Sequence, residues 1–372
     1  MPDPFTQKPL VASVYVDYEA ISQNAALAQS LSPQAKLLCM IKANAYGHGI
    51  TEVCRQLNLK CYGFGVARLD EAILLRENGC EKPIVVMSEL LTTQKLADYV
   101  HHQFTPVVHA DANASALAQA CEEKQLPFWI KIDTGMHRLG LSETTVNQLA
   151  TKADVIATHM HSADQLDNKS IDTQTDNFER MSGDSASRHF SLANSATLLR
   201  CEDSKNYATW LHKHAPTLAN NKEIIRPGIM LYGADPLRVA NSSSKKLQPA
   251  MTFAAPVIDL HKLRKGECVG YGQRWQAERD SLIATVAVGY GDGYPRHACN
   301  GTPVLINGQQ GKLAGTVSMD MIGVDITDVD HVAIGDTAIL WGDQLPVETI
   351  ARCANTISYT LLTGITRRVK RL

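Results

Sequence analysis

The sequence lacks the features that mark membrane-spanning, exported and nucleic-acid-binding proteins. No apolar run approaches the roughly 18 residues that a membrane helix requires, and the N-terminus has no basic region leading into an apolar core, so no signal peptide is visible. The formal net charge of the 372 residues is only -2, and the one short basic segment, residues 367–371, reads as a solvated terminus. We therefore expect a cytoplasmic protein whose partners are neither nucleic acids nor membranes.

Cysteine usage excludes a disulfide framework. The nine cysteines are an odd number, they are scattered along the chain, and no two of them form a C-x-x-C pair. This pattern is typical of a reduced cytosolic protein rather than of a secreted domain or a zinc site. No spacing of His, Asp and Glu suggests a catalytic metal site either, so no metal is expected.

The first part of the chain contains alternating strand-like and helix-like stretches. The predicted strands are 37–41, 62–66, 84–87, 105–108, 128–132, 155–160, 189–192 and 224–225. The predicted helices are 52–57, 69–77, 92–99, 112–123, 144–152, 174–181 and 196–199. Eight alternating units over about 230 residues suit an α/β fold of the (β/α)8 TIM-barrel type, whose usual size is about 250 residues. A doubly wound α/β sheet makes the same alternation and stays open as the alternative.

The last part of the chain has a different pattern. Short strand-like runs at 251–260, 282–288, 304–306, 321–326 and 337–341 are separated by turns, and helical periodicity is scarce until 347–354. Asn307-Gly308 is a strong hairpin signal. The polar run at 241–246 is the best linker candidate. We predict a barrel domain over residues 12–240 and a mainly β domain over residues 245–372, with the N-terminal segment 1–11 as a candidate addition to the β domain.

The most informative stretch runs from Leu37 to Ile50. Five apolar residues lead into Lys42, small residues and a tyrosine follow, and Gly47-His48-Gly49 turns the chain. The short apolar run predicts a strand buried on both faces, so Lys42 lies where that strand ends. An amine in an apolar environment loses affinity for its proton. We interpret Lys42 as a nucleophile that can form a Schiff base with an aldehyde.

Other chemically active residues fall at the ends of the later strands, which form the active face of a barrel. They are Lys131, Asp133 and Arg138 around the fifth strand, His159 and His161 after the sixth, Asn194 and Ser195 after the seventh, and Arg226 to Gly233 after the eighth. Gly228 lets main-chain N–H groups approach an anion, and Ser195 adds a hydroxyl donor. The two together favour a phosphate site. His48, His137 and His161 are interpreted as structural.

Several motifs resemble those of the bacterial alanine racemases, in order and at the spacing of that family. Lys42-Ala43-Asn44-Ala45-Tyr46-Gly47-His48-Gly49 is similar to the family's pyridoxal-phosphate motif. The other matching segments are Arg226–Gly233, Val269–Gly272, Val288–Arg296, Val317–Met321 and Ile357–Tyr359. The resemblance covers essentially the whole chain. It departs from some relatives at Ser318, where they have cysteine, and at His137, where they have glycine.

The resemblance implies an isomerase that interconverts L-alanine and D-alanine, with pyridoxal 5′-phosphate as cofactor. It implies a homodimer whose active sites are shared between subunits, and a role in supplying D-alanine for peptidoglycan or in consuming it. Racemisation removes a proton from one face of Cα and returns one to the other, so two bases are required. By resemblance they are Lys42, which would also hold the cofactor aldimine, and Tyr271 from the other subunit.

The remaining site residues are also assigned by the resemblance. The resemblance assigns cofactor binding to Lys42, Tyr46, His159, Ser195, Arg226, Gly228, Ile229 and Tyr359. It assigns substrate binding to Arg138 and Met319, and supporting roles to Lys131, Tyr290, Arg296 and Asp320. Lys131 matches a lysine that is carbamylated in many family members. Arg226 would face the pyridine nitrogen and, because a guanidinium only donates hydrogen bonds, would leave that nitrogen unprotonated and the ring a weaker electron sink.

Three other functions are compatible with parts of the sequence. A pyridoxal-phosphate decarboxylase of the same architecture typically places a carboxylate at the pyridine nitrogen, so Arg226 argues against it. A non-enzymatic pyridoxal-phosphate regulator is shorter and lacks the β domain, so Tyr271 argues against that function. A broader racemase that acts on serine, lysine or arginine stays open.

Overall fold

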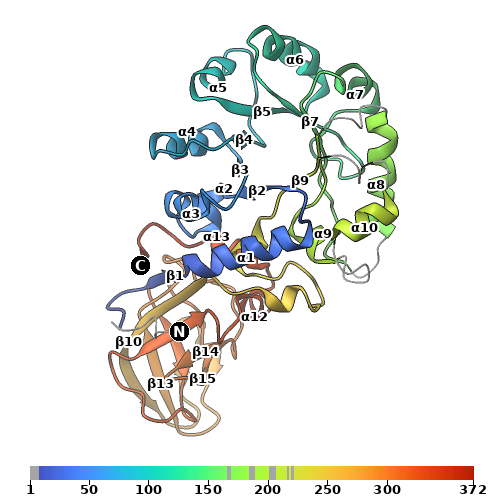
Figure 1. Ribbon diagram of the computed structural model, residues 1–372. Coiled ribbons are helices and arrows are strands. Elements are labelled where there is room, and N and C mark those ends of the chain that lie inside the picture. The colour runs from blue at the N-terminus through green and yellow to red at the C-terminus, as the bar shows by residue number, and fades with distance from the viewer. Residues whose placement is uncertain (1–7, 166–168, 184–188, 201–206, 216–217, 219–221) are drawn as a thin grey trace. The chain divides into compact units, whose positions relative to one another are not determined.

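The computed structural model describes residues 8–165, 169–183, 189–200, 207–215, 218 and 222–372, which form two compact units. The barrel unit consists of Ile21–Ala45 and Gly49–Leu247. The β unit consists of the chain up to Ala20, of Tyr46–His48 and of Gln248–Leu372. The three residues Tyr46–His48 are thus grouped with the β unit, although their neighbours in the sequence belong to the barrel unit. Figure 1 labels the helices and strands of both units.

Eight parallel strands form the barrel unit. They are β2 (Lys36–Met40), β3 (Gly63–Val66), β4 (Ile84–Val86), β5 (Phe104–Val108), β6 (Trp129–Lys131), β7 (Val155–Ala157), β8 (His189–Ser191) and β9 (Ile224–Ile225). Their order is β8-β7-β6-β5-β4-β3-β2-β9, and parallel bridges between Phe190 and Glu223 and between Asn194 and Arg226 join β8 to β9. The sheet is therefore closed, which confirms the predicted barrel and excludes the doubly wound alternative.

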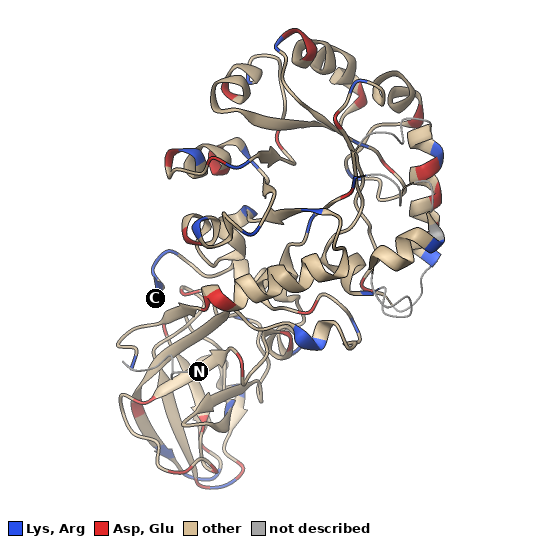
Figure 2. Cartoon of the chain, in the orientation of Figure 1, with Lys and Arg blue, Asp and Glu red and all other residues tan. Residues whose placement is uncertain are grey.

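Helices alternate with these strands. They are α1 (Tyr18–Leu31), α3 (Ile50–Leu57), α4 (Leu69–Glu77), α5 (Leu96–His102), α6 (Ala114–Glu123), α7 (Glu143–Leu149), α8 (Lys169–Ser182), α9 (Ser195–Arg200) and α10 (Tyr207–His214). Acidic and basic residues are both present on the outer helices, such as α4 and α8 (Figure 2). The sequence did not predict α10. The mixture of signs agrees with a net charge near zero.

The barrel strands are buried, but most are shorter than predicted. Leu37, Leu38 and Cys39 on β2 are at most 2% exposed, as expected for strands covered on both faces. The strand predicted at 155–160 ends at Ala157 in β7, and the strand predicted at 128–132 ends at Lys131 in β6. The residues beyond these ends leave the sheet and form the loops at its carboxyl edge. Those loops carry the polar side chains of the candidate site.

The β unit is mainly β, as predicted, and the structure shows that its sheet is mostly antiparallel. Its strands are β1 (Ser13–Val16), β10 (Met251–Leu263), β13 (Ser281–Val286), β14 (Pro303–Ile306), β15 (Gln309–Leu313), β16 (Ile322–Asp325), β17 (Thr337–Trp341) and β18 (Lys370–Arg371), in the order β13-β16-β15-β14-β17-β10-β1-β18. The long strand β10 also pairs with β13 and is irregular between Val257 and Asp259. The Asn307-Gly308 turn joins β14 to β15 as a hairpin. Two short helices, α12 (Val347–Cys353) and α13 (Ser358–Thr363), complete the unit together with the hairpin of β11 (Cys268–Val269) and β12 (Trp275–Gln276).

The polar run at 241–246 is an ordered turn rather than a loose connection. Asn241 Oδ1 accepts the N–H groups of Ser243 and Ser244 at 3.1 and 2.8 Å, and Asn241 Nδ2 donates to the carbonyl of Leu199 at 2.7 Å. Ser243 and Ser244 are buried. Short polar side chains satisfy the main chain here, and this is why a sequence typical of a linker is held in place.

None of the described helices is both long enough and apolar enough to cross a bilayer.

Candidate active site

Lys42 begins a left-handed turn directly after β2. Ala43, Asn44, Ala45 and Tyr46 all have φ between 52° and 55°. L-residues disfavour this conformation by about 1–2 kcal/mol each, so the turn needs external support. Glu71 Oε1 accepts the Ala43 N–H at 2.6 Å, and Asn44 Oδ1 accepts the N–H of Ile50 at 3.0 Å. The sequence predicted a turn here but gave no sign of its hand or of Glu71.

The surroundings of the Lys42 amine are positively charged. Burial lowers the pKa of Lys42. The charges of Arg138 and Arg226 lower this pKa further, and the charge of Glu71 opposes them. Burial together with Arg226, Arg138 and Lys42 lowers the pKa of Lys131 to about 8. An amine with a lowered pKa is available as a nucleophile or base at a lower pH than an ordinary lysine. A cluster of this kind is suited to anionic ligands.

Arg226 is buried, and its guanidinium is held by main-chain carbonyl groups. Nη1 donates to the Ser191 carbonyl at 2.8 Å and also contacts the Ser191 hydroxyl, and Nη2 donates to the Thr158 carbonyl. Burial lowers the pKa of Arg226 to about 10, while Glu223 opposes the shift, so the side chain stays charged at neutral pH. No described carboxylate forms an ion pair with it. Main-chain carbonyl groups of the barrel, and not a counter-ion, therefore hold its guanidinium in place.

His159 lies beside these cations and is uncharged at neutral pH. Burial lowers its pKa to about 3, with further contributions from Arg226 and Lys131. The imidazole can therefore pack against an aromatic ligand or accept a hydrogen bond without adding positive charge.

A set of hydrogen-bond donors lies where β8 and β9 end. Ser195 is the first residue of α9, and its Oγ accepts the N–H groups of Gly228 at 2.8 Å and Met230 at 3.4 Å. In the described part of the chain, the Ser195 hydroxyl hydrogen and the Ile229 N–H have no acceptor. Met40 N–H donates to the Pro227 carbonyl at 2.9 Å, which ties this edge to the strand that carries Lys42. These donors fit a phosphate group.

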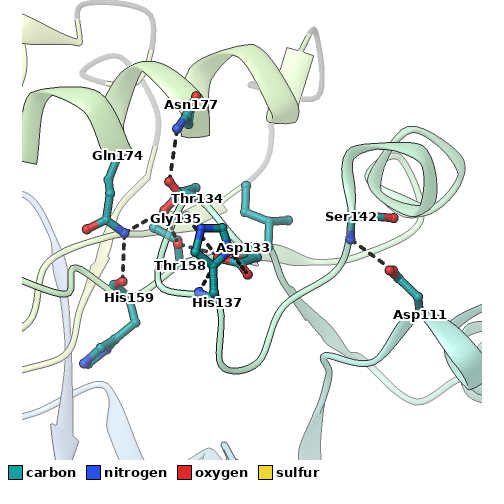
Figure 3. A network of polar contacts seen from close by, with 11 residues as sticks. Asp111, Asp133, Thr134, Gly135, His137, Ser142, Thr158, His159, Gln174 and Asn177 are labelled. Carbon is teal, nitrogen blue, oxygen red and sulfur yellow. Dashed lines mark hydrogen bonds and ion pairs between the residues drawn. The ribbon is translucent and has the colours of Figure 1, made fainter. Parts of the chain in front are cut away.

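The loop after β6 presents Arg138. Asp133 Oδ1 accepts the N–H groups of Gly135 and His137, each at 3.0 Å, and its Oδ2 lies 3.3 Å from His137 Nδ1 (Figure 3). His137 has φ 53°, and this conformation turns the chain so that the next residue is exposed. Within the described chain Arg138 forms no ion pair and is free to bind a carboxylate. His137 has the structural role that the sequence suggested.

The other site residues predicted from the sequence lie in the β unit. Tyr271 follows β11 and is 73% exposed, and Met319 is 52% exposed. Tyr290 N–H donates to the Ser318 carbonyl at 3.0 Å, and the Arg296 guanidinium lies 5.9 Å from the centre of the Tyr290 ring. Tyr290 and Met319 belong to a platform, which we define as Tyr290–Asp292 and Ser318–Asp320; its Asp292 side chain is buried.

Arg368 fixes this platform. Its Nε donates to Asp292 at 2.7 Å, and its Nη2 donates to Asp320 at 2.8 Å. Arg371 Nε, three residues on, donates to the Gly47 carbonyl at 3.0 Å. The basic C-terminal segment, interpreted from the sequence as a solvated terminus, therefore has two arginines with structural contacts. Their partners are distant in the sequence, so no local pattern announced them.

Two tyrosines of the predicted phosphate set also lie in the β unit. The ring centres of Tyr46 and Tyr359 are 6.0 Å apart, and burial raises the pKa of Tyr46. The structure thus groups Lys42, Lys131, Arg138, His159, Ser195, Arg226, Gly228 and Ile229 in the barrel unit, and Tyr46, Tyr271, Tyr290, Arg296, Met319, Asp320 and Tyr359 in the β unit.

Comparisons with known proteins agree over the whole chain. Residues 16–236 match the family described as alanine racemase, N-terminal domain, and residues 250–372 match alanine racemase, C-terminal domain. A protein named alanine racemase from Chromohalobacter salexigens is 39% identical over 98% of this chain and 97% of its own length. One from Vibrio cholerae is 36% identical over 96% of this chain and 97% of its own length.

Solved structures give the same result. The biosynthetic alanine racemase of Pseudomonas aeruginosa has a TM-score of 0.86 and 34% identity, with 98% of this chain and 99% of that chain covered. The alanine racemase of Bartonella henselae, solved with covalently bound pyridoxal phosphate, has a TM-score of 0.85 and 27% identity at the same coverage.

The left-handed turn can be tested through Ala43, which is exposed and so contributes little packing. A β-branched residue is strongly disfavoured at positive φ, and we expect Ala43→Val to lower the free energy of unfolding by about 1–2 kcal/mol. The control is Ala97→Val, at an exposed alanine of the right-handed helix α5. Equal losses of stability in urea denaturation of the two variants would contradict the strained turn.

In the protein without bound ligands, the positive charge on Lys131 should lower the free energy of unfolding. Its lowered pKa means that the folded protein carries the cost of the buried charge below pH 8, and that the cost disappears as the pH rises towards the ordinary value of 10.5. We expect Lys131→Met to raise the free energy of unfolding at pH 7 by about 1–3 kcal/mol in bicarbonate-free buffer, and this gain should shrink by pH 10. Lys124→Met, at an exposed position, is the control. A gain that does not change with pH would refute the assignment.

Proposed function

The chain belongs to the alanine racemase family, and on that premise we propose how its own residues interconvert L-alanine and D-alanine. The observation that carries the proposal is the Lys42 amine, which lies at the end of a buried barrel strand with its pKa lowered by burial and by Arg138 and Arg226. The protein is an isomerase. The assignments of individual residues, the cofactor and the assembly are our proposals.

The proposed cofactor is pyridoxal 5′-phosphate, and the donors of the barrel unit support it. When bound, this group supplies an electron-withdrawing ring that acidifies the Cα–H bond of an amino acid. Lys42 Nζ would hold it covalently. The Ser195 hydroxyl and the Ile229 N–H would bind its phosphate, since neither hydrogen has an acceptor in the described chain, and Gly228, whose N–H donates to Ser195 Oγ, would lie beside it. Tyr46 and Tyr359 would add their hydroxyl groups to the same phosphate.

Arg226 and His159 would orient the aromatic part of the cofactor. The fixed guanidinium of Arg226 would donate to the ring nitrogen and leave it unprotonated. The neutral His159 would pack beside the ring. Because such a ring withdraws electrons only weakly, return of the proton to Cα is favoured over loss of another group.

Two bases would move the proton at Cα. We propose that Lys42 Nζ takes or returns it on one face and that the hydroxyl of Tyr271 acts on the opposite face. The lowered pKa of Lys42 supports its part, because a neutral amine is required to accept the proton. Arg138 would bind the carboxylate of alanine, together with Met319 of the partner subunit. Lys131 would support Arg138, and its pKa of about 8 leaves neutral amine for carbamylation by CO2.

We propose a homodimer in which Tyr271 of the partner subunit completes each site. The 73% exposure of the Tyr271 ring supports this, because a catalytic tyrosine needs a covered environment that its own surroundings do not supply. Tyr290, Arg296 and Asp320 would line the entrance from the same platform. The domain division near residue 245 stays a prediction. Eight free cysteines among the described residues support the expected cytoplasmic location.

Two physiological roles are compatible with this activity: supply of D-alanine for peptidoglycan, and consumption of D-alanine. A strain without the gene separates them, since it requires D-alanine for growth only in the first case.

The attachment residue is tested by reduction. After treatment of the protein with pyridoxal 5′-phosphate and borohydride, peptide mass spectrometry should find a stable adduct on Lys42 and on no other lysine. Lys42→Ala should show no adduct and lose racemisation by at least about 10³-fold, because it removes both the attachment point and one base. Lys152→Ala, at an exposed lysine, is the control. An adduct on another lysine would contradict the assignment of Lys42 as the attachment residue.

The shared site is tested by mixing two inactive variants. Lys42→Ala and Tyr271→Phe should each be inactive alone, while co-expressed subunits should recover about a quarter of wild-type activity. Random pairing makes half of the dimers mixed, and each mixed dimer has one site with both bases intact. If each site were built within one subunit, the mixture would stay inactive.

A further inference from the structure

Gln174 is a buried amide that joins two loops at the carboxyl edge of the barrel. It lies on α8 and is 1% exposed. Its Nε2 donates to Thr134 Oγ1 at 2.9 Å and to the His159 carbonyl at 3.1 Å (Figure 3). Its Oε1 accepts the His161 N–H at 2.9 Å. Thr134 belongs to the loop after β6, and both histidines belong to the loop after β7. One side chain thus holds both loops.

A chain of hydrogen bonds continues from Gln174 to Arg226. Thr134 Oγ1 lies 2.8 Å from Thr158 Oγ1, which donates to the Ile132 carbonyl at 3.1 Å. The carbonyl of Thr158 accepts a hydrogen bond from Arg226 Nη2. Thr134 and Thr158 are each 2% exposed, so water does not replace these contacts easily. The position of Arg226 therefore depends on the same network.

The other end of the network leads to Arg138. Asn177, one turn after Gln174 on α8, donates through Nδ2 to the Thr134 carbonyl at 3.1 Å. Thr134 begins the segment that Asp133 folds into a turn and that ends at Arg138. The polar face of α8 thus holds the base of the loop that presents Arg138.

We propose that Gln174 is a positioning residue that sets the spacing between Arg138 and Arg226, and so aligns the substrate carboxylate with the cofactor ring. This inference rests on the proposed function, which assigns those two arginines. An amide is required, because the site needs an acceptor for one N–H and donors for a hydroxyl and a carbonyl. A carboxylate at this position accepts the first bond but donates neither of the others. Packing of α8 is separate, since it relies on Ile171, Phe178 and Met181.

The isosteric change Gln174→Glu tests the proposal. We expect the KM for alanine to rise by about 10- to 100-fold with a smaller change in kcat, because displacement of a binding group by about 1 Å costs on this order. The melting temperature and the borohydride adduct at Lys42 should stay near wild type. A fall in melting temperature with an unchanged KM would mean that Gln174 serves only the fold, and would overturn the proposal.

Threonine variants keep the test valid if Gln174→Glu does not fold. Thr134→Val should raise KM in the same way, and Thr134→Ser, which keeps the hydroxyl, should restore it. The matched control is Thr175→Val: Thr175 is adjacent on α8 and 1% exposed, and its hydroxyl has no hydrogen-bond partner among the described residues. Equal effects of Thr134→Val and Thr175→Val on KM would contradict a role for the network.

A measurement on the cofactor-free protein separates this inference from the proposed function. Hydrogen exchange followed by mass spectrometry should show faster exchange of peptides covering 133–138 and 159–162 in Gln174→Glu and Thr134→Val, but not in Thr175→Val. Unchanged exchange would overturn the inference whether or not the protein racemises alanine. If the wild type instead forms no adduct at Lys42, the proposed function fails while the exchange result still stands.

Discussion

Positive charge gathered at one end of a barrel is the constraint on which the rest of this structure depends. Burial and the nearby Arg138 and Arg226 disfavour the charged forms of both Lys42 and Lys131, and Lys42 adds to the effect on Lys131. Glu71 and Asp133 are the carboxylates that oppose it. Such a cluster is unfavourable without anions and favourable with them, so the same arrangement that lowers the amine pKa values also selects ligands that carry phosphate and carboxylate groups.

The barrel holds these cations by neutral groups. Carbonyls of Ser191 and Thr158 surround the Arg226 guanidinium, and a buried glutamine, Gln174, fixes the loops on either side. Carboxylates in the same places would have neutralised the cluster and returned the lysine pKa values towards normal. Neutral acceptors instead fix geometry while preserving the electrostatic character of the site. The strained turn after Lys42 is an exception, because the Glu71 carboxylate that accepts the Ala43 N–H also opposes the lowering of the Lys42 pKa.

The β unit presents the exposed side chains that our proposal assigns to a partner subunit's site. Tyr271 and Met319 are exposed to solvent. The main chain at Tyr290 is held by a hydrogen bond to the Ser318 carbonyl, and the Asp292 carboxylate is held by Arg368. Rigid support beneath exposed side chains is typical of a surface that binds another molecule, since little ordering is then required on association. A second copy of the chain is the partner that our proposal assigns to it.

The sequence by itself determined the fold class and pointed to Lys42 as the residue that our proposal assigns to cofactor attachment. Apolar runs and turn residues are local, so the barrel strands, the Asn307-Gly308 hairpin and the place of Lys42 at a strand end could all be predicted. Only the tertiary structure decided that β8 joins β9, that the turn after Lys42 is left-handed, and which main-chain and side-chain groups Glu71, Gln174 and Arg368 bind. Each of these depends on contacts between residues 13 or more positions apart in the chain or on backbone strain held by such contacts, and local periodicity contains no information about them.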